Sequence, residues 1–86
     1  MMYTDGIHLI SDTGMQELYE FGEKLGFKRE WVHHTPGRPH FDLMTEEVLR
    51  KAIQAGAKRV GRREFVSALR RNPLYQQFKS NPRLDK

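Results

Sequence analysis

The sequence contains no cysteine. This absence excludes disulfides, a thiol nucleophile and thiolate metal sites, and it is typical of proteins in a reducing compartment. The chain also lacks any apolar run of the ~20 residues that a bilayer-spanning helix needs. Its first residues have neither the basic start nor the apolar stretch of a signal peptide. We therefore expect a cytoplasmic protein with no membrane segment.

The chain is short and basic. Its 86 residues leave room for one hydrophobic core and no second domain, and so small a core leaves self-association as a homodimer open. Lys and Arg total 15 against 11 Asp and Glu, and Glu64 is the only acidic residue between Lys51 and Lys79. This basic half predicts a negatively charged partner, nucleic acid or nucleotide. The alternative is a solvated face that keeps the protein soluble.

Short β-type runs are separated by turn signals and helical patterns. Residues 2–4 end at an Asp-Gly turn, and residues 7–10 are either a second strand or a buried lead-in to the first helix. Residues 27–33 alternate in part and predict another strand. Residues 34–39 contain two prolines and a glycine and predict a loop. Residues 57–60 are short and compatible with a further strand.

Three helices are expected between these runs. Thr13 and Gln16 have the spacing of a capping box for the first helix, Ser11 and Asp12 are alternative caps, and Gly26 is suited to end it. Thr45 is the expected cap of the second helix. Residues 62–71 form the third helical pattern, and Asn-Pro follows it as a stop signal.

The alternation of strands and helices predicts the α/β class. We expect a small two-layer or three-layer domain with three or four short, mostly parallel strands and three helices. One domain is expected over residues 1–79, with a polar, flexible tail over residues 80–86.

Several motifs together resemble one protein family. They are Tyr-Thr-Asp at 3–5, His-Leu-Ile-Ser-Asp at 8–12, His-Phe-Asp-Leu at 40–43, and Ala-Gly-Ala at 55–57 followed by Arg-Arg-Glu-Phe-Val at 62–66. Over residues 2–71 the chain resembles domain-of-unknown-function family 4031, small bacterial and phage proteins with no assigned activity. Members often carry a longer, Trp-containing segment before the His-Leu motif, which is short here. The signature positions that the resemblance implies are His8, Ser11, Asp12, His40, Asp42 and Arg63.

Histidine and aspartate residues form the first candidate site. Functional groups gather beyond the carboxyl ends of parallel strands, so we expect the polar residues at these junctions to converge. These residues are His8, Asp12, His40 and Asp42, with Asp5, His33 and His34 nearby in the sequence. Imidazole with carboxylate suits a divalent metal such as Zn or Mn, or an acid–base pair. This set predicts a small metal-dependent hydrolase or nuclease. Structural roles are the alternative, with the histidines bonded to loop backbone and the aspartates capping turns or helices.

Arginines near helix starts form the second candidate site. Arg62 and Arg63 begin the third helix and Arg38 lies in the 34–39 loop. Free backbone N–H groups at a helix start bind anions, and Arg pairs with phosphate in bidentate fashion. No Walker loop or Gly-x-Gly-x-x-Gly motif is present. This set predicts an accessory module that binds nucleic acid or a nucleotide, unless Arg63 instead pairs with an acidic residue such as Asp42.

A protein partner is the third hypothesis. The resemblance suggests by analogy a phage-type protein-interaction factor. The C-terminal basic and aromatic residues suit single-stranded nucleic acid, or alternatively packing on the core or on a second subunit. They are Arg70, Arg71, Tyr75, Phe78 and Lys79.

Overall fold

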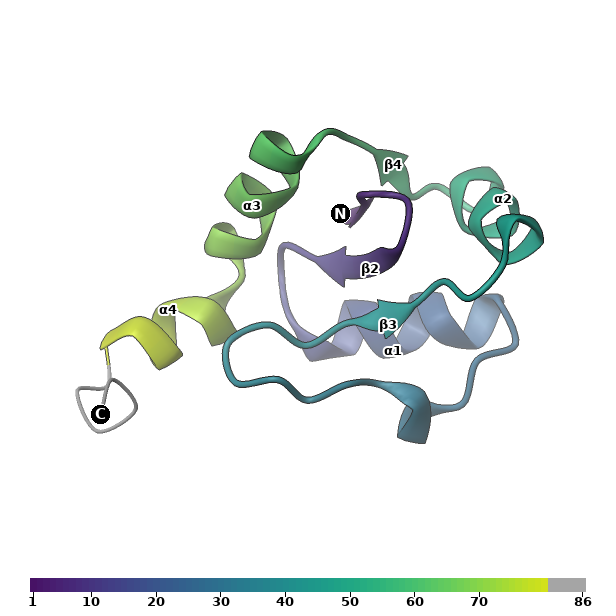
Figure 1. Cartoon of the computed structure of the whole chain (residues 1–86). Coiled ribbons are helices and arrows are strands. Elements are labelled where there is room, and N and C mark those ends of the chain that lie inside the picture. Colours follow the sequence, from purple (N-terminus) through teal and green to yellow (C-terminus); the bar gives the residue numbers. More distant parts are fainter. Residues whose placement is uncertain (81–86) are drawn as a thin grey trace.

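The computed structural model describes residues 1–80 (Figure 1). The elements in chain order are β1 (Met2–Thr4), β2 (His8–Ser11), α1 (Met15–Lys24), the 3-10 helix η1 (Arg29–Trp31), β3 (Phe41–Asp42), α2 (Glu46–Gln54), β4 (Lys58–Arg59), α3 (Arg62–Arg71) and α4 (Pro73–Ser80). The α/β class expected from the sequence is confirmed. Of the tail expected over residues 80–86, Ser80 ends α4 and the remainder lies outside the described residues. Within residues 1–80, no helix combines the length and the apolar character needed to span a membrane.

The four strands form one mixed sheet in the order β3-β2-β1-β4. β1 pairs with β2 and β2 pairs with β3 in antiparallel fashion, whereas β1 and β4 are parallel. The sheet is therefore mixed rather than mostly parallel, which corrects the sequence-based expectation. The reason is the short connection between β1 and β2, because two parallel strands need a crossover of about a dozen residues or more.

Asp5 holds the turn between β1 and β2. Its carboxylate accepts hydrogen bonds from the backbone N–H groups of Ile7 at 2.9 Å and His8 at 2.8 Å. Gly6 adopts a φ of 106°, a left-handed conformation in which a side chain would be strained. The turn thereby sets the residue at which β2 begins, and with it the face to which His8 points.

Helices cover both faces of the sheet (Figure 1). Successive strand residues point to opposite faces, so Leu9 and Ile10 enter different layers. Leu9 packs in a core with Leu18 of α1 and Ala52 of α2, whereas Ile10 packs in a second core with Leu69 of α3. The fold is a three-layer arrangement, with α1 and α2 on one face and α3 on the other.

The strand expected over residues 27–33 is wrong. Residues 29–31 form η1, and the segment meets the sheet only at an isolated bridge between His33 and His40. Phe27 is partly buried and Val32 fully buried against the α1-side core, while Trp31 is 51% exposed. The segment packs along the edge of the core. Its apolar residues alternate in part because of this packing, and the sequence pattern was therefore mistaken for a strand.

The helix starts differ in how they are capped. Thr45 caps α2 as expected, because its Oγ1 accepts from the Val48 N–H at 3.1 Å. The capping box expected for α1 is wrong: the N-cap is Gly14, and the Ser11 hydroxyl accepts the N–H groups of Thr13 and Gly14. Ser11 is itself buried at the end of β2, which brings its hydroxyl under this turn.

Candidate metal and phosphate site

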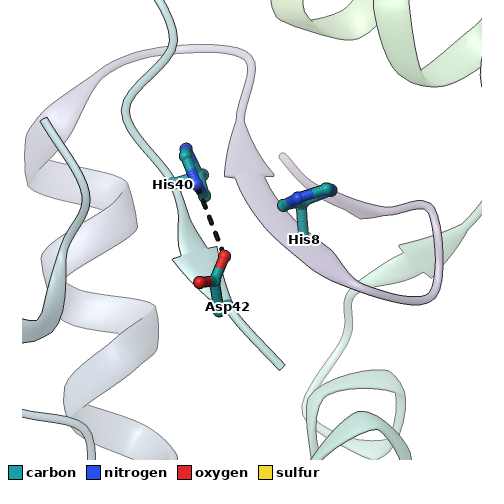
Figure 2. Close-up of side chains that lie close together, drawn as sticks. All are labelled: His8, His40 and Asp42. Atoms are coloured by element: carbon teal, nitrogen blue, oxygen red, sulfur yellow. Dashed lines mark ion pairs between the residues drawn. The ribbon is translucent and has the colours of Figure 1, made fainter. Parts of the chain in front are cut away.

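His8, His40 and Asp42 form a cluster on the α3 face of the sheet (Figure 2). His8 and Asp42 are register partners across the β2–β3 pair, so their side chains point to the same face. His40 lies two residues before Asp42 and continues the same side of the extended chain. The ring of Phe65 on α3 lies 6.3 Å from the His8 ring, which places this helix over the cluster.

The three side chains present ligand atoms at the spacing of a metal site. One ligand atom from each residue lies within 4.8 Å of the other two. Nε2 of His40 is 3.4 Å from Oδ1 of Asp42, and the His8 and His40 rings meet edge to face with centroids 5.2 Å apart. Their side chains are 41%, 18% and 34% exposed for His8, His40 and Asp42, so an ion from solvent can reach all three.

The Nδ1 atom of each cluster histidine, His8 and His40, already has a partner within the protein. Nδ1 of His40 lies 2.9 Å from the Arg38 carbonyl, which can only accept a hydrogen bond. Nδ1 of His8 lies 3.1 Å from the Asp5 carboxylate. Burial acts to raise the pKa of Asp5, but hydrogen bonds from His8 and Ile7 outweigh it and hold this pKa below its ordinary value. Because both partners accept, each neutral ring carries its proton on Nδ1 and keeps the Nε2 lone pair free for a metal.

His33 contacts the Asp42 carboxylate through the oxygen that does not face His40. Its Nε2 lies 3.0 Å from Oδ2 of Asp42, while the other oxygen of Asp42 faces His40. The His33 and His40 rings are stacked, with centroids 5.1 Å apart and planes 12° apart. From the sequence, we placed His33 close to the candidate residues but predicted no role for it. Its place in the site depends on the bridge to His40, which pairs the two ends of the intervening loop. The one signal in the sequence that could have found His33 is that it lies close to His34 and His40.

Asp12 is not brought to this cluster. It follows β2 at the opposite end from His8, about 13 Å away at a strand rise of ~3.3 Å per residue. Its carboxylate pairs with the Met1 ammonium at 2.8 Å and with Arg71 at 3.4 Å. Burial acts to raise the pKa of Asp12, but these partners outweigh it and lower the pKa below its ordinary value. The expectation that all four polar residues converge therefore fails at Asp12, because His8 begins the strand that Asp12 follows.

Two of the three predicted arginines line the same groove as the histidines. The groove has a volume of about 640 Å³ and lies between β2, the loop before β3 and the first turns of α3. Its polar lining includes Asp5, His8, Arg38, His40 and Arg62. Arg63 is exposed on α3 outside this lining, and Asp42 contacts His33 and His40 rather than Arg63.

The first turn of α3 also opens on the groove. Gly61 is the N-cap and offers no side chain to the helix N–H groups, and both Gly61 and Arg62 line the groove. The Gly61 carbonyl accepts the first intrahelical bond from Phe65 at 2.9 Å. The N–H groups before Phe65 have no acceptor within the helix, and they lie at the positive end of its dipole.

Two of the other basic and aromatic residues near the C-terminus, Arg71 and Tyr75, have packing roles. The Arg71 guanidinium lies 5.5 Å from the Tyr3 ring centroid and donates to the Tyr3 hydroxyl. Tyr75 packs against the α3-side core. For these two residues the packing alternative is confirmed. The side chains of Phe78 and Lys79 lie outside what the structure describes.

Comparison with protein families matches residues 4–72 to the family described as "Protein of unknown function (DUF4031)". The matched region contains every residue of the cluster and both arginines of the groove. No curated protein and no solved structure matches the chain.

Proposed function

The chain belongs to the DUF4031 family, and from the geometry of its site we propose that it binds a phosphate-bearing ligand around a divalent metal ion. The ligand is a nucleotide or nucleic acid, and the ion is Zn or Mn. His8, His40 and Asp42 hold the metal, and Arg38 and Arg62 bind the phosphate. The observation that carries the proposal is that both sets of residues, through His8 and His40, open on one groove.

The chemistry of the two sets is complementary. Two imidazoles and one carboxylate suit Zn or Mn, and the bound ion adds positive charge to the groove. Arg side chains bind phosphate oxygens with paired, charge-assisted hydrogen bonds. The uncapped start of α3 adds backbone donors on the same side. Among the described residues, Asp5 is the only carboxylate that lines the groove, and its contact with His8 engages it.

Hydrolysis of the bound phosphoester is the second candidate function. The observation that favours it is the number of protein ligands, since the cluster found within residues 1–80 has three. Three protein ligands leave a coordination position for water, and a divalent ion lowers the pKa of that water. The groove would then hold the phosphoester beside the activated water.

Calorimetric titration with a nucleoside monophosphate, with and without Zn, tests the proposal. We expect phosphate binding that requires the metal and weakens as salt rises. Arg62→Ala should weaken it at least about tenfold through the lost charge-assisted bonds. Arg63→Ala is the matched control, because its side chain is exposed on the same helix outside the groove.

Three outcomes separate the alternatives. Release of inorganic phosphate, or cleavage of an oligonucleotide, would select the hydrolase. An equal loss of phosphate affinity in Arg62→Ala and Arg63→Ala would indicate general attraction of the phosphate to a basic surface. Absence of metal and phosphate binding in the wild-type protein would reject the proposal and direct the search to a protein partner.

A further inference from the structure

A second groove lies on the other side of the His33–Asp42 pair. It has a volume of about 500 Å³ and runs between η1, β3 and the start of α2. Its lining is mainly apolar and includes Phe27, Trp31 and Met44, with Glu30, His33 and Asp42 as its polar groups. No arginine or lysine within residues 1–80 lines it. This groove therefore differs in chemistry from the phosphate groove, which contains two arginines.

Large apolar side chains are exposed at this groove. Trp31 is 51% exposed and Met44 is 81% exposed. The Trp31 ring packs on Phe27, with centroids 6.0 Å apart and planes tilted by 51°, and the Phe27 centroid in turn lies 5.1 Å from that of the buried Phe41. An indole fixed in this way offers a flat surface on which another ring can stack.

The two grooves come close together at Asp42, which lines the apolar groove and contacts His40 of the phosphate groove. One carboxylate oxygen of Asp42 faces His40 in the metal cluster, and the other faces His33. Both Asp42 and His33 line the apolar groove. A metal ion held by Asp42 would therefore lie next to the apolar groove, whose lining also includes Trp31.

We propose that the apolar groove binds the nucleobase of the ligand whose phosphate occupies the metal groove. This inference rests on the proposed function and names its substrate class. The separation of charge matches a nucleotide: the arginines lie at the phosphate end, and the acceptor-only Glu30 lies at the aromatic end. A carboxylate pairs best with a base that presents two adjacent N–H donors, so guanine is the preferred base. A free nucleotide and a base in a single strand share this chemistry.

Trp31 is the only tryptophan in the chain, so its fluorescence reports the groove directly. The experiment compares guanosine monophosphate with ribose 5-phosphate in the presence of Zn, by calorimetry and by tryptophan fluorescence. We expect both ligands to bind, and guanosine monophosphate to bind about tenfold more tightly, because the stacking of one base on an aromatic ring contributes about this much affinity. Only the guanosine ligand should quench Trp31. Inosine monophosphate, which lacks the second donor, should bind less tightly than guanosine monophosphate.

Three variants isolate the base contacts. Trp31→Ala should lose most of the preference for guanosine monophosphate over ribose 5-phosphate, and Trp31→Phe should retain more of it because a ring remains. Glu30→Gln should reduce the preference for guanosine over inosine monophosphate. A guanine-containing trinucleotide distinguishes the sources, because tighter binding than the mononucleotide indicates nucleic acid as the natural ligand.

Three results would overturn the inference. Equal binding of guanosine monophosphate and ribose 5-phosphate by the wild-type protein would reject the base groove and leave the phosphate site standing. No binding of either phosphate would reject both proposals. A Trp31 signal that changes with protein concentration alone, together with a dimer in light scattering, would assign the groove to a second copy of the chain.

Discussion

His8 and Asp42 face each other as register partners on two adjacent antiparallel strands. Their positions depend on two loops, the three-residue turn after β1 and the long connection from α1 to β3. Each strand is held by its strand pairing and by its packing on the core. The pairing therefore keeps the two side chains together without a bound ligand. The cluster is thus built on the sheet, whereas the arginines come from a loop and a helix start.

Asp5 is predicted to tune metal binding without touching the metal. Asp5→Asn keeps an oxygen that can accept the Ile7 and His8 N–H groups, but it removes the charge beside Nδ1 of His8. Partners of this kind typically contribute about 10-fold to 100-fold in metal affinity. We expect Zn to bind at least about tenfold more weakly, measured by competition with a chelator. Unfolding in urea should confirm that the turn survives, and unchanged Zn affinity would contradict this role.

Gly22 is predicted to be required for the packing of β3. A Cβ atom at this position would lie 2.5 Å from Cε2 of Phe41, the residue before Asp42. Overpacking of this kind destabilises a core by about 1–3 kcal/mol. Gly22→Ala should lower the free energy of unfolding by this amount in urea and should also weaken metal binding. Gly61→Ala is the control, since nothing lies within 4 Å of its added Cβ.

If the clash with Phe41 causes the loss, a smaller side chain should relieve it. The double variant Gly22→Ala with Phe41→Leu should then lose less stability than the two single changes added together. Additive losses would show that Gly22 matters for another reason, such as its place in α1.

Acid is predicted to destabilise the fold through carboxylates that are already paired. The pKa values of Asp5, Asp12 and Glu17 all lie below their ordinary values of 3.8, 3.8 and 4.5, because hydrogen bonds outweigh the opposing effect of burial. The unfolded chain therefore binds protons more readily than the folded chain. Their contribution to stability is complete above these ordinary values, and it is lost as the pH falls through the lowered ones.

Asp12→Asn provides the test of this acid dependence. The variant cannot form the ion pairs with the Met1 ammonium and Arg71, so it should be less stable than wild type near neutral pH. The difference should shrink as the pH falls below 3.8, because the wild-type carboxyl is then losing the same interactions. Urea unfolding at several pH values measures it, and a difference that stays constant with pH would contradict the assignment.

Local signals in the sequence predicted most helices, and three of the four metal candidates that it gave lie together in the structure. Thr45 was identified as a cap because its partner, the Val48 N–H, lies three residues away. His8, His40 and Asp42 were found because they flank predicted junctions. Asp12 was grouped with them on the assumption of parallel strands, whose ends share one edge. In the observed hairpin, His8 and Asp12 lie at opposite ends of one strand.

Long-range pairing explains what the sequence did not reveal. His33 joins the site through a bridge to His40 across a proline-containing loop, and no local pattern encodes this pairing. Arg62 and Arg63 are indistinguishable as neighbours in sequence, yet the rotation of α3 turns only Arg62 into the groove. The segment 27–33 packs its apolar residues on a core edge rather than in the sheet.

Zn titration of chelator-treated protein, followed by calorimetry, tests the central claim most directly. We predict that wild type binds a single ion, that His40→Ala and Asp42→Asn lose this binding, and that His34→Ala retains it. His34 is the matched control because it is an exposed histidine beside His33 and is not part of the cluster. Failure of the wild-type protein to bind Zn or Mn, or equal loss in His34→Ala and His40→Ala, would contradict a metal site at His8, His40 and Asp42.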